Sequence, residues 1–122
     1  MPQHNLSVGR YGEELAKKFL QDKDFEIIKS HFTSHWGELD IIAKKDNKLH
    51  FVEVKTRIDR KMGKPYEAVT AYKIRSLMRC IQFYILKFKM KNYKLSLDVI
   101  SIILNDDMSI YNFNWFQNVG TG

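Results

Sequence analysis

Apolar side chains recur along the chain with two different periods, which predict where helices and strands lie. Between residues 8 and 22 the period is three to four, as in a helix that buries one face; the positions are Val8, Tyr11, Leu15, Ala16, Phe19 and Leu20. Ser7 precedes them and is a favourable N-cap. Residues 70–89 show the same period at Ile74, Leu77, Met78, Ile81, Ile85 and Phe88. The pattern therefore predicts two amphipathic helices.

The remaining apolar segments are short and typical of β-strands. Three of them, at residues 25–30, 39–43 and 49–54, lie between the helices, and the turn over residues 45–48 predicts a hairpin between the last two. Residues 95–104 are rich in β-branched side chains, and residues 110–116 follow a turn and are expected to form an edge strand. Residues 31–36 and 56–69 are expected to be loops, the second because it is polar and contains glycine and proline.

This order of elements, α-β-β-β-α-β-β, predicts an α/β fold with a mixed sheet flanked by helices. The length of 122 residues fits a single domain with one ordinary core over residues 1–122. We expect residues 8–104 to form that core and residues 105–122 to add a C-terminal strand or tail.

Cysteine content and hydropathy exclude several classes of protein. Cys80 is the only cysteine, so an intrachain disulfide and a multi-cysteine zinc site are both excluded. No segment approaches about 18 uninterrupted apolar residues, the length of a membrane span. Residues 1–7 also lack the apolar run of a signal peptide. A cytoplasmic protein without membrane contact is therefore expected.

Positive charge is concentrated in one part of the chain. Residues 55–94 hold twelve Lys or Arg and two acidic residues, whereas the chain as a whole has a net charge of +6. A segment of this kind is either a solvated surface or a surface that binds phosphate groups, and charge alone does not separate the two.

Two carboxylates and a lysine lie on the predicted hairpin that precedes the basic segment. Because strand side chains alternate, Glu53 and Lys55 point to one face of the sheet. Asp40 lies on the partner strand, where Leu39 and Ile41 are expected to face away from it. The set can converge on one patch, with the carbonyl of Val54 as a neutral third ligand. Such oxygens bind Mg²⁺ (or Mn²⁺), and the lysine can stabilise charge on a phosphate under attack.

The alternative is an ordinary ion pair between Glu53 and Lys55 on a wet strand, since the spacing alone has low specificity. The apolar surroundings favour the metal site, because acids within a buried strand are costly without a partner or an ion.

Several motifs together resemble an uncharacterised bacterial family typified by YraN. These motifs are Gly9-x-x-Gly12-Glu13-x-x-Ala16, Gly37-Glu38-Leu39-Asp40, Phe51-Val52-Glu53-Val54-Lys55-x-Arg57, Lys73 and Asp98-Val99. They span most of the chain. That family is similar to the PD-(D/E)XK nucleases, particularly the archaeal Holliday-junction resolvases. The resemblance implies the αβββαβ core of the restriction endonucleases and a catalytic site of Asp40, Glu53 and Lys55, supported by Glu13.

The chain departs from the family pattern at two places. The family often has Asn-x-Arg before the glycine of the second motif, where this chain has residues 31–36, and a basic residue commonly stands at the position of Leu97. Both changes remove polar groups, so substrate contacts there differ from those of the family.

The sequence leaves two interpretations open for several other polar and aromatic residues. Glu38 is either an additional acid near the metal or a salt-bridge partner. His31 and His35 are four apart in an expected loop, and zinc binding there is disfavoured because no third ligand is near. The alternating aromatic residues of the last strand favour core packing over base stacking; they are Tyr111, Phe113 and Trp115.

The sequence thus predicts a Mg²⁺-dependent nuclease that acts on DNA, branched or damaged DNA included by analogy with the resolvases. The alternative is a non-catalytic nucleic-acid-binding module that keeps the nuclease fold. The residues expected to contact nucleic acid are Arg57, Arg60, Lys61, Lys64 and Lys73. The choice between DNA and RNA and the oligomeric state, a homodimer included, stay open.

Overall fold

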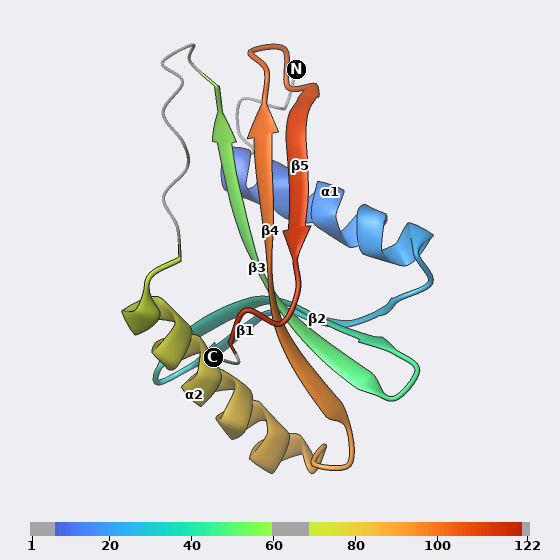
Figure 1. Cartoon of the computed structure of the whole chain (residues 1–122), viewed down its shortest axis with the longest axis vertical. Coiled ribbons are helices and arrows are strands. Elements are labelled where there is room, and N and C mark those ends of the chain that lie inside the picture. The colour runs from blue at the N-terminus through green and yellow to red at the C-terminus, as the bar shows by residue number, and fades with distance from the viewer. Residues whose placement is uncertain (1–6, 60–68, 121–122) are drawn as a thin grey trace.

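Two helices and five strands make up the chain, as shown by a computed structural model that describes residues 7–59 and 69–120 (Figure 1). The elements in chain order are α1 (Val8–Asp22), β1 (Glu26–Ser34), β2 (Gly37–Lys45), β3 (Lys48–Ile58), α2 (Ala71–Phe88), β4 (Lys94–Leu104) and β5 (Ile110–Phe116). This α/β order confirms the one expected from the hydrophobic pattern.

Both helices begin at side-chain caps. The hydroxyl of Ser7 accepts a hydrogen bond from the Arg10 amide at 3.0 Å, and the hydroxyl of Thr70 accepts one from the Lys73 amide at 3.1 Å. Each bond satisfies one of the free amides in a first helical turn. α2 ends at Phe88 and is followed by the C-cap Lys89, which adopts the left-handed conformation at φ 58° and donates its amide to the carbonyl of Ile85. The caps thus fix where each helix starts.

The five strands form one mixed sheet in the order β1-β2-β3-β4-β5. Neighbouring strands are antiparallel except β3 and β4, which are parallel. A parallel pair needs a long crossover, and α2 occupies it. The helices cover opposite faces: α2 packs on one apolar cluster that includes Leu39 and Phe51, and α1 packs on another that includes Ile41 and Val52. No helix within the described residues is both long and apolar enough to cross a membrane.

β2 and β3 are paired over only part of their lengths. The ladder runs from Ile41 opposite Val52 to Lys45 opposite Lys48. Beyond Val52, β3 continues to Ile58 paired with β4 alone. In Figure 1 the β1–β2 hairpin runs across the molecule while β3, β4 and β5 stay side by side. The two parts of the sheet therefore separate between Asp40 and Glu53.

The expected loop at residues 31–36 is mostly strand, which corrects the sequence prediction. β1 continues to Ser34 and pairs with β2 as far as Gly37. The apolar alternation fades there because β1 is an edge strand in which only Phe32 is buried. The second expected loop starts three residues late, since β3 extends to Ile58, and its residues 60–68 lie outside the described part of the chain.

A candidate metal centre where two strands separate

Asp40 lies on β2 at the point where the ladder to β3 stops. Its Oδ2 accepts a hydrogen bond from the Val54 amide at 2.8 Å. This carboxylate thus replaces the backbone carbonyl that a continued ladder would have supplied, and a buried amide stays satisfied. Because N–H and C=O of one residue in an extended strand point to the same edge, the Val54 carbonyl is directed into the same gap.

Glu53 approaches Asp40 from the neighbouring strand. Glu53 is buried, with 8% of its surface exposed. Its carboxyl group donates a hydrogen bond to the carboxylate of Asp40. The Nζ atom of Lys73, from the first turn of α2, lies 3.7 Å from Oε2 of Glu53. The two carboxyl groups are therefore hydrogen-bonded to each other, with a lysine beside them.

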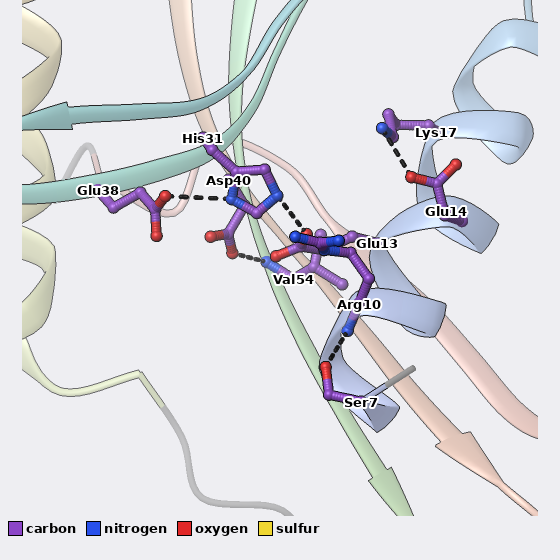
Figure 2. A network of polar contacts seen from close by, with 9 residues as sticks. All are labelled: Ser7, Arg10, Glu13, Glu14, Lys17, His31, Glu38, Asp40 and Val54. Atoms are coloured by element: carbon purple, nitrogen blue, oxygen red, sulfur yellow. Dashed lines mark hydrogen bonds and ion pairs between the residues drawn. The ribbon is translucent and has the colours of Figure 1, made fainter. Parts of the chain in front are cut away.

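Glu13 reaches the same gap from α1. The helix can come this close because the residue before it is Gly12, where an added Cβ would lie only 1.8 Å from the Thr56 hydroxyl oxygen of β3. Glu14, the next residue, points away and pairs with Lys17 at 2.8 Å (Figure 2). The close helix–strand contact thus selects Glu13 for the site and leaves Glu14 outside it.

His31 is a site residue that the sequence interpretation missed. Its Nε2 lies 2.8 Å from Oε1 of Glu13, and its Nδ1 lies 3.1 Å from Oε2 of Glu38. Figure 2 shows the ring lying between the two carboxylates above Asp40. His31 lowers the pKa values of Glu13 and Asp40, against the effect of burial. The position of Glu38 is thereby explained as a partner of His31.

The ligand atoms of Glu13, His31 and Asp40 all lie within 4.8 Å of one another. Two oxygen ligands on one Mg²⁺ are about 3 to 4 Å apart. A small side-chain rotation of Glu13 would bring its carboxylate oxygen from within 4.8 Å of Asp40 to the distance of about 3 to 4 Å that one ion requires. Glu53 is not part of this group of three, but its carboxyl group is hydrogen-bonded to that of Asp40 from the adjacent strand.

All three acids have raised pKa values, and burial is the largest cause in each case. Burial and the negative charge of Asp40 raise the pKa of Glu53 to about 7, against Lys73 and Lys55, which lower it. Burial raises the pKa of Asp40 although the Val54 amide and Glu53 donate to it. Burial, and then Asp40, raise the pKa of Glu13. Withdrawal from water therefore contributes more to these shifts than repulsion between the carboxylates does.

The lysines and arginines predicted to act in catalysis or to contact nucleic acid differ in how close they lie to the acids. Lys55 follows Glu53 on the same face of β3 and is close enough to lower its pKa, but less than Lys73 does. Lys73, expected to contact phosphate, pairs with Glu53. Arg57 is half-buried on β3. Arg60, Lys61 and Lys64 lie outside the described residues.

The aromatic residues of β5 divide between core and surface. Phe113 and Trp115 pack against the apolar cluster under α1, as expected, whereas Tyr111 is 62% exposed.

Comparison with known proteins places this arrangement in a family. The sequence model of the uncharacterised protein family UPF0102 matches residues 12–102, which include Glu13, His31, Asp40 and Glu53. A UPF0102 protein of Clostridium perfringens is 37% identical over 118 residues, 97% of each chain. Another, of Syntrophomonas wolfei, is 39% identical over 108 residues, 88% of this chain and 94% of its own. The chain therefore belongs to the uncharacterised family UPF0102.

Proposed function

We propose that this protein is a divalent-metal-dependent nuclease that hydrolyses phosphodiester bonds, with DNA as the favoured substrate. One observation carries the proposal: carboxyl groups from three different elements, α1, β2 and β3, converge where the sheet opens. A merely structural ion pair on an exposed strand would leave these acids near their ordinary pKa values. Here burial raises the pKa of all three acids.

The donors fit a hard divalent cation. Asp40, Glu53 and Glu13 supply carboxylate oxygens and Val54 a carbonyl, the ligands that Mg²⁺ and Mn²⁺ prefer. His31 is held on both ring nitrogens by Glu13 and Glu38, so we assign it the role of positioning Glu13. Such a cation supplies Lewis-acid polarisation of a phosphate.

The side chains around the acids are arranged to respond to a cation. Glu53 has a pKa of about 7 and therefore loses its proton at little cost near neutral pH. Lys73, which is half-exposed, then has freedom to turn from Glu53 towards a phosphate. Lys55 follows Glu53 on the same strand face and is placed to stabilise negative charge on the phosphate.

Nucleic acid is favoured as the substrate by charge and by resemblance. Ten excess positive charges lie between residues 55 and 94, directly after the acid on β3. The element order also agrees with the αβββαβ core of the PD-(D/E)XK nucleases that the motifs resemble. The similarity to Holliday-junction resolvases adds branched DNA to the substrates to be tested.

The proposal is tested first by metal binding and then by cleavage. Isothermal titration with Mn²⁺ should show binding to the wild type, and Glu13→Gln and Asp40→Asn should weaken it. Glu14→Gln is the matched control, because it removes the same charge from the adjacent residue outside the site. Cleavage is then measured with Mn²⁺ on linear, flapped, four-way and single-stranded DNA. Asp40→Asn should abolish cleavage and leave DNA binding intact.

Two outcomes would contradict the proposal. Equal Mn²⁺ affinities of the Glu13→Gln and Glu14→Gln variants would show that Mn²⁺ does not bind at the proposed site. DNA binding without Mn²⁺ binding or cleavage would instead identify a non-catalytic nucleic-acid-binding module with the same fold.

A further inference from the structure

A second buried polar cluster surrounds Asp98 on β4, a residue with no exposed surface. Four groups donate to its carboxylate: Ser96 Oγ at 2.5 Å, His50 Nδ1 at 2.7 Å, Trp115 Nε1 at 3.0 Å and the Asn118 amide at 3.1 Å. Burial raises the pKa of Asp98, but hydrogen bonds from His50, Ser96 and Asn118 outweigh it, so the pKa lies below its usual value. Asp98 is therefore a carboxylate anion that fixes the rings around it.

The orientation of His50 follows from this bond. An ionised Asp98 accepts from Nδ1, so the proton is on Nδ1 and the ring turns Nε2 away from the carboxylate. Among the residues that the structure describes, none forms a hydrogen bond with Nε2. The ring of Phe25 meets His50 edge-on at 4.9 Å and holds it further. His50 is thus a rigid, nearly buried ring with one nitrogen available.

His50 lines a pocket of about 520 Å³, within the usual range for small-molecule sites. The pocket lies beside the β2–β3 turn, where the amide of Lys94 at the start of β4 donates to the carbonyl of Asn47. Trp115 lines another side, and the amide side chains of Asn47 and Gln117 complete the polar part of the wall. This place is separate from the candidate metal centre: His50 precedes Glu53 by three residues, about 10 Å along a strand.

Positive charge dominates the lining. Four lysines from three separate parts of the chain contribute to it, against one acid, Asp46; they are Lys23, Lys45, Lys48 and Lys94. Lys45 is held in place, because its Nζ donates to the carbonyl of Lys23 at 2.9 Å and lies 5.4 Å from the centre of the Phe25 ring. Lysines from three separate segments thus line one pocket, with the Nζ atom of Lys23 lying 5.2 Å from the centre of the Phe19 ring. An anion bound there would offset the repulsion between their positive charges.

We propose that this pocket binds a phosphorylated nucleoside, with the phosphate held by the lysines, a donor group of the nucleoside on the free nitrogen of His50, and the base beside Trp115. A lone inorganic ion would leave most of 520 Å³ unfilled, whereas a base gains apolar contact with Trp115 and hydrogen bonds from Asn47 and Gln117. The nucleotide can come from two sources, a free mononucleotide or the phosphorylated end of a strand. The proposal does not depend on the nuclease function, since it uses none of that site's residues.

Binding is measured with the full chain carrying Trp36→Phe, which leaves Trp115 as its only tryptophan. Calorimetry and Trp115 fluorescence follow titrations with inorganic phosphate, deoxyadenosine monophosphate and a short oligonucleotide with either a 5′-phosphate or a 5′-hydroxyl end. Replacing Lys48 and Lys94 with Gln should weaken mononucleotide binding about tenfold or more, as for the loss of charge-assisted hydrogen bonds. Lys18→Gln with Lys87→Gln, two helix lysines outside the pocket, is the charge-matched control.

The outcomes separate the sources and the alternatives. The ligand is a strand end if the 5′-phosphorylated oligonucleotide binds more tightly than both its 5′-hydroxyl form and the mononucleotide. The ligand is the free form if the mononucleotide binds most tightly of the three. Equal affinities of phosphate and mononucleotide would overturn the nucleotide assignment. Absence of binding at millimolar concentrations, or equal effects of the two lysine pairs, would overturn the site. Asp40→Asn should bind the mononucleotide as the wild type does, so failure of the nuclease proposal leaves this result interpretable.

Discussion

Asp40 combines a structural contact with a chemical position, and the two are served by different properties of its side chain. Its Oδ2 satisfies the Val54 amide, which any side-chain oxygen in the same place would also do. Its negative charge acts on Glu13 and Glu53, whose pKa values it raises. Asparagine keeps the oxygen and removes the charge. The Asp40→Asn variant should therefore stay folded, which makes it the right substitution for the metal and cleavage tests.

Glu53 should make the protein less stable as the pH rises. Its pKa is about 7 in the folded chain against an ordinary value of 4.5, so between these values the folded state holds a proton that the unfolded state has lost. The free energy of unfolding therefore falls from pH 4.5 to 7, by about 3 kcal/mol for this group. Glu53→Gln removes this loss, and urea denaturation at pH 8 should show the variant to be more stable than the wild type.

The gain of Glu53→Gln should largely disappear at pH 4, where both states of the wild type hold the proton. Glu14→Gln, on the solvent side of α1, should show no such pH dependence. A variant that is equally destabilised at both pH values would mean that Glu53 contributes packing or an ion pair with Lys73, and the assigned effect of burial would be wrong.

At the level of elements, the contact between α1 and β3 sets the position of Glu13. A Cβ at Gly12 would meet three atoms of Thr56 at 1.8, 2.7 and 2.8 Å. Gly12→Ala must therefore push the helix away from the strand. We expect a loss of about 1 to 3 kcal/mol in unfolding free energy. Mn²⁺ affinity, measured by calorimetry, should fall with it because Glu13 moves with the helix.

Gly9 offers a matched control in the same helix. Within residues 7–59 and 69–120, the only atom near an added Cβ there is the Ser7 hydroxyl oxygen, at 4.0 Å. Gly9→Ala should therefore stabilise the protein by up to about 1 kcal/mol, through helix propensity alone. If both alanine variants were equally stable and bound Mn²⁺ equally, the close contact at Gly12 would have no role in placing Glu13.

The hydrophobic pattern predicted the elements well where each has a buried face. Both helices and the buried strands follow from residues such as Leu20, Leu77 and Ile100, whose side chains have at most 2% exposure. β1 was predicted too short because its outer half is a polar edge strand. There His31 adopts φ 57°, a local irregularity that apolar periodicity does not report. The position of His31 in the site was therefore missed.

The acids of the candidate site were predictable as a set, but their geometry was only partly so. Strand alternation placed Glu53 and Lys55 on one face, as observed. It also predicted that Leu39 and Ile41 share a face, whereas Leu39 packs under α2 and Ile41 under α1. Alternation fails at Asp40 because the sheet opens there, and this opening brings Glu13 and Glu53 to Asp40 from opposite faces. A regular sheet would have kept them apart.

At the scale of the molecule, the candidate centre joins distant parts of the chain. β3 passes through it with Glu53, and α2 returns to it with Lys73 after the connection between them. The basic residues of that connection, Arg60, Lys61 and Lys64, precede α2 in the sequence. The polypeptide thus leaves the acids, crosses a strongly basic segment, and comes back to the acids. This connectivity is the reason to expect the segment to bind the same substrate.

Salt dependence of DNA binding tests that expectation. Each phosphate neutralised by a cationic side chain adds about 0.9 to the slope of log affinity against log salt concentration. If Arg60, Lys61 and Lys64 each contact a phosphate, replacing all three with Gln should reduce the slope by up to about 3 and weaken binding at low salt. Fluorescence anisotropy with a four-way junction, with Ca²⁺ in place of Mn²⁺ to prevent turnover, gives both quantities. The control replaces three exposed lysines on other surfaces, Lys18, Lys29 and Lys87. Equal slopes in the two triple variants would remove residues 60–64 from the interface and assign the charge to general solubility.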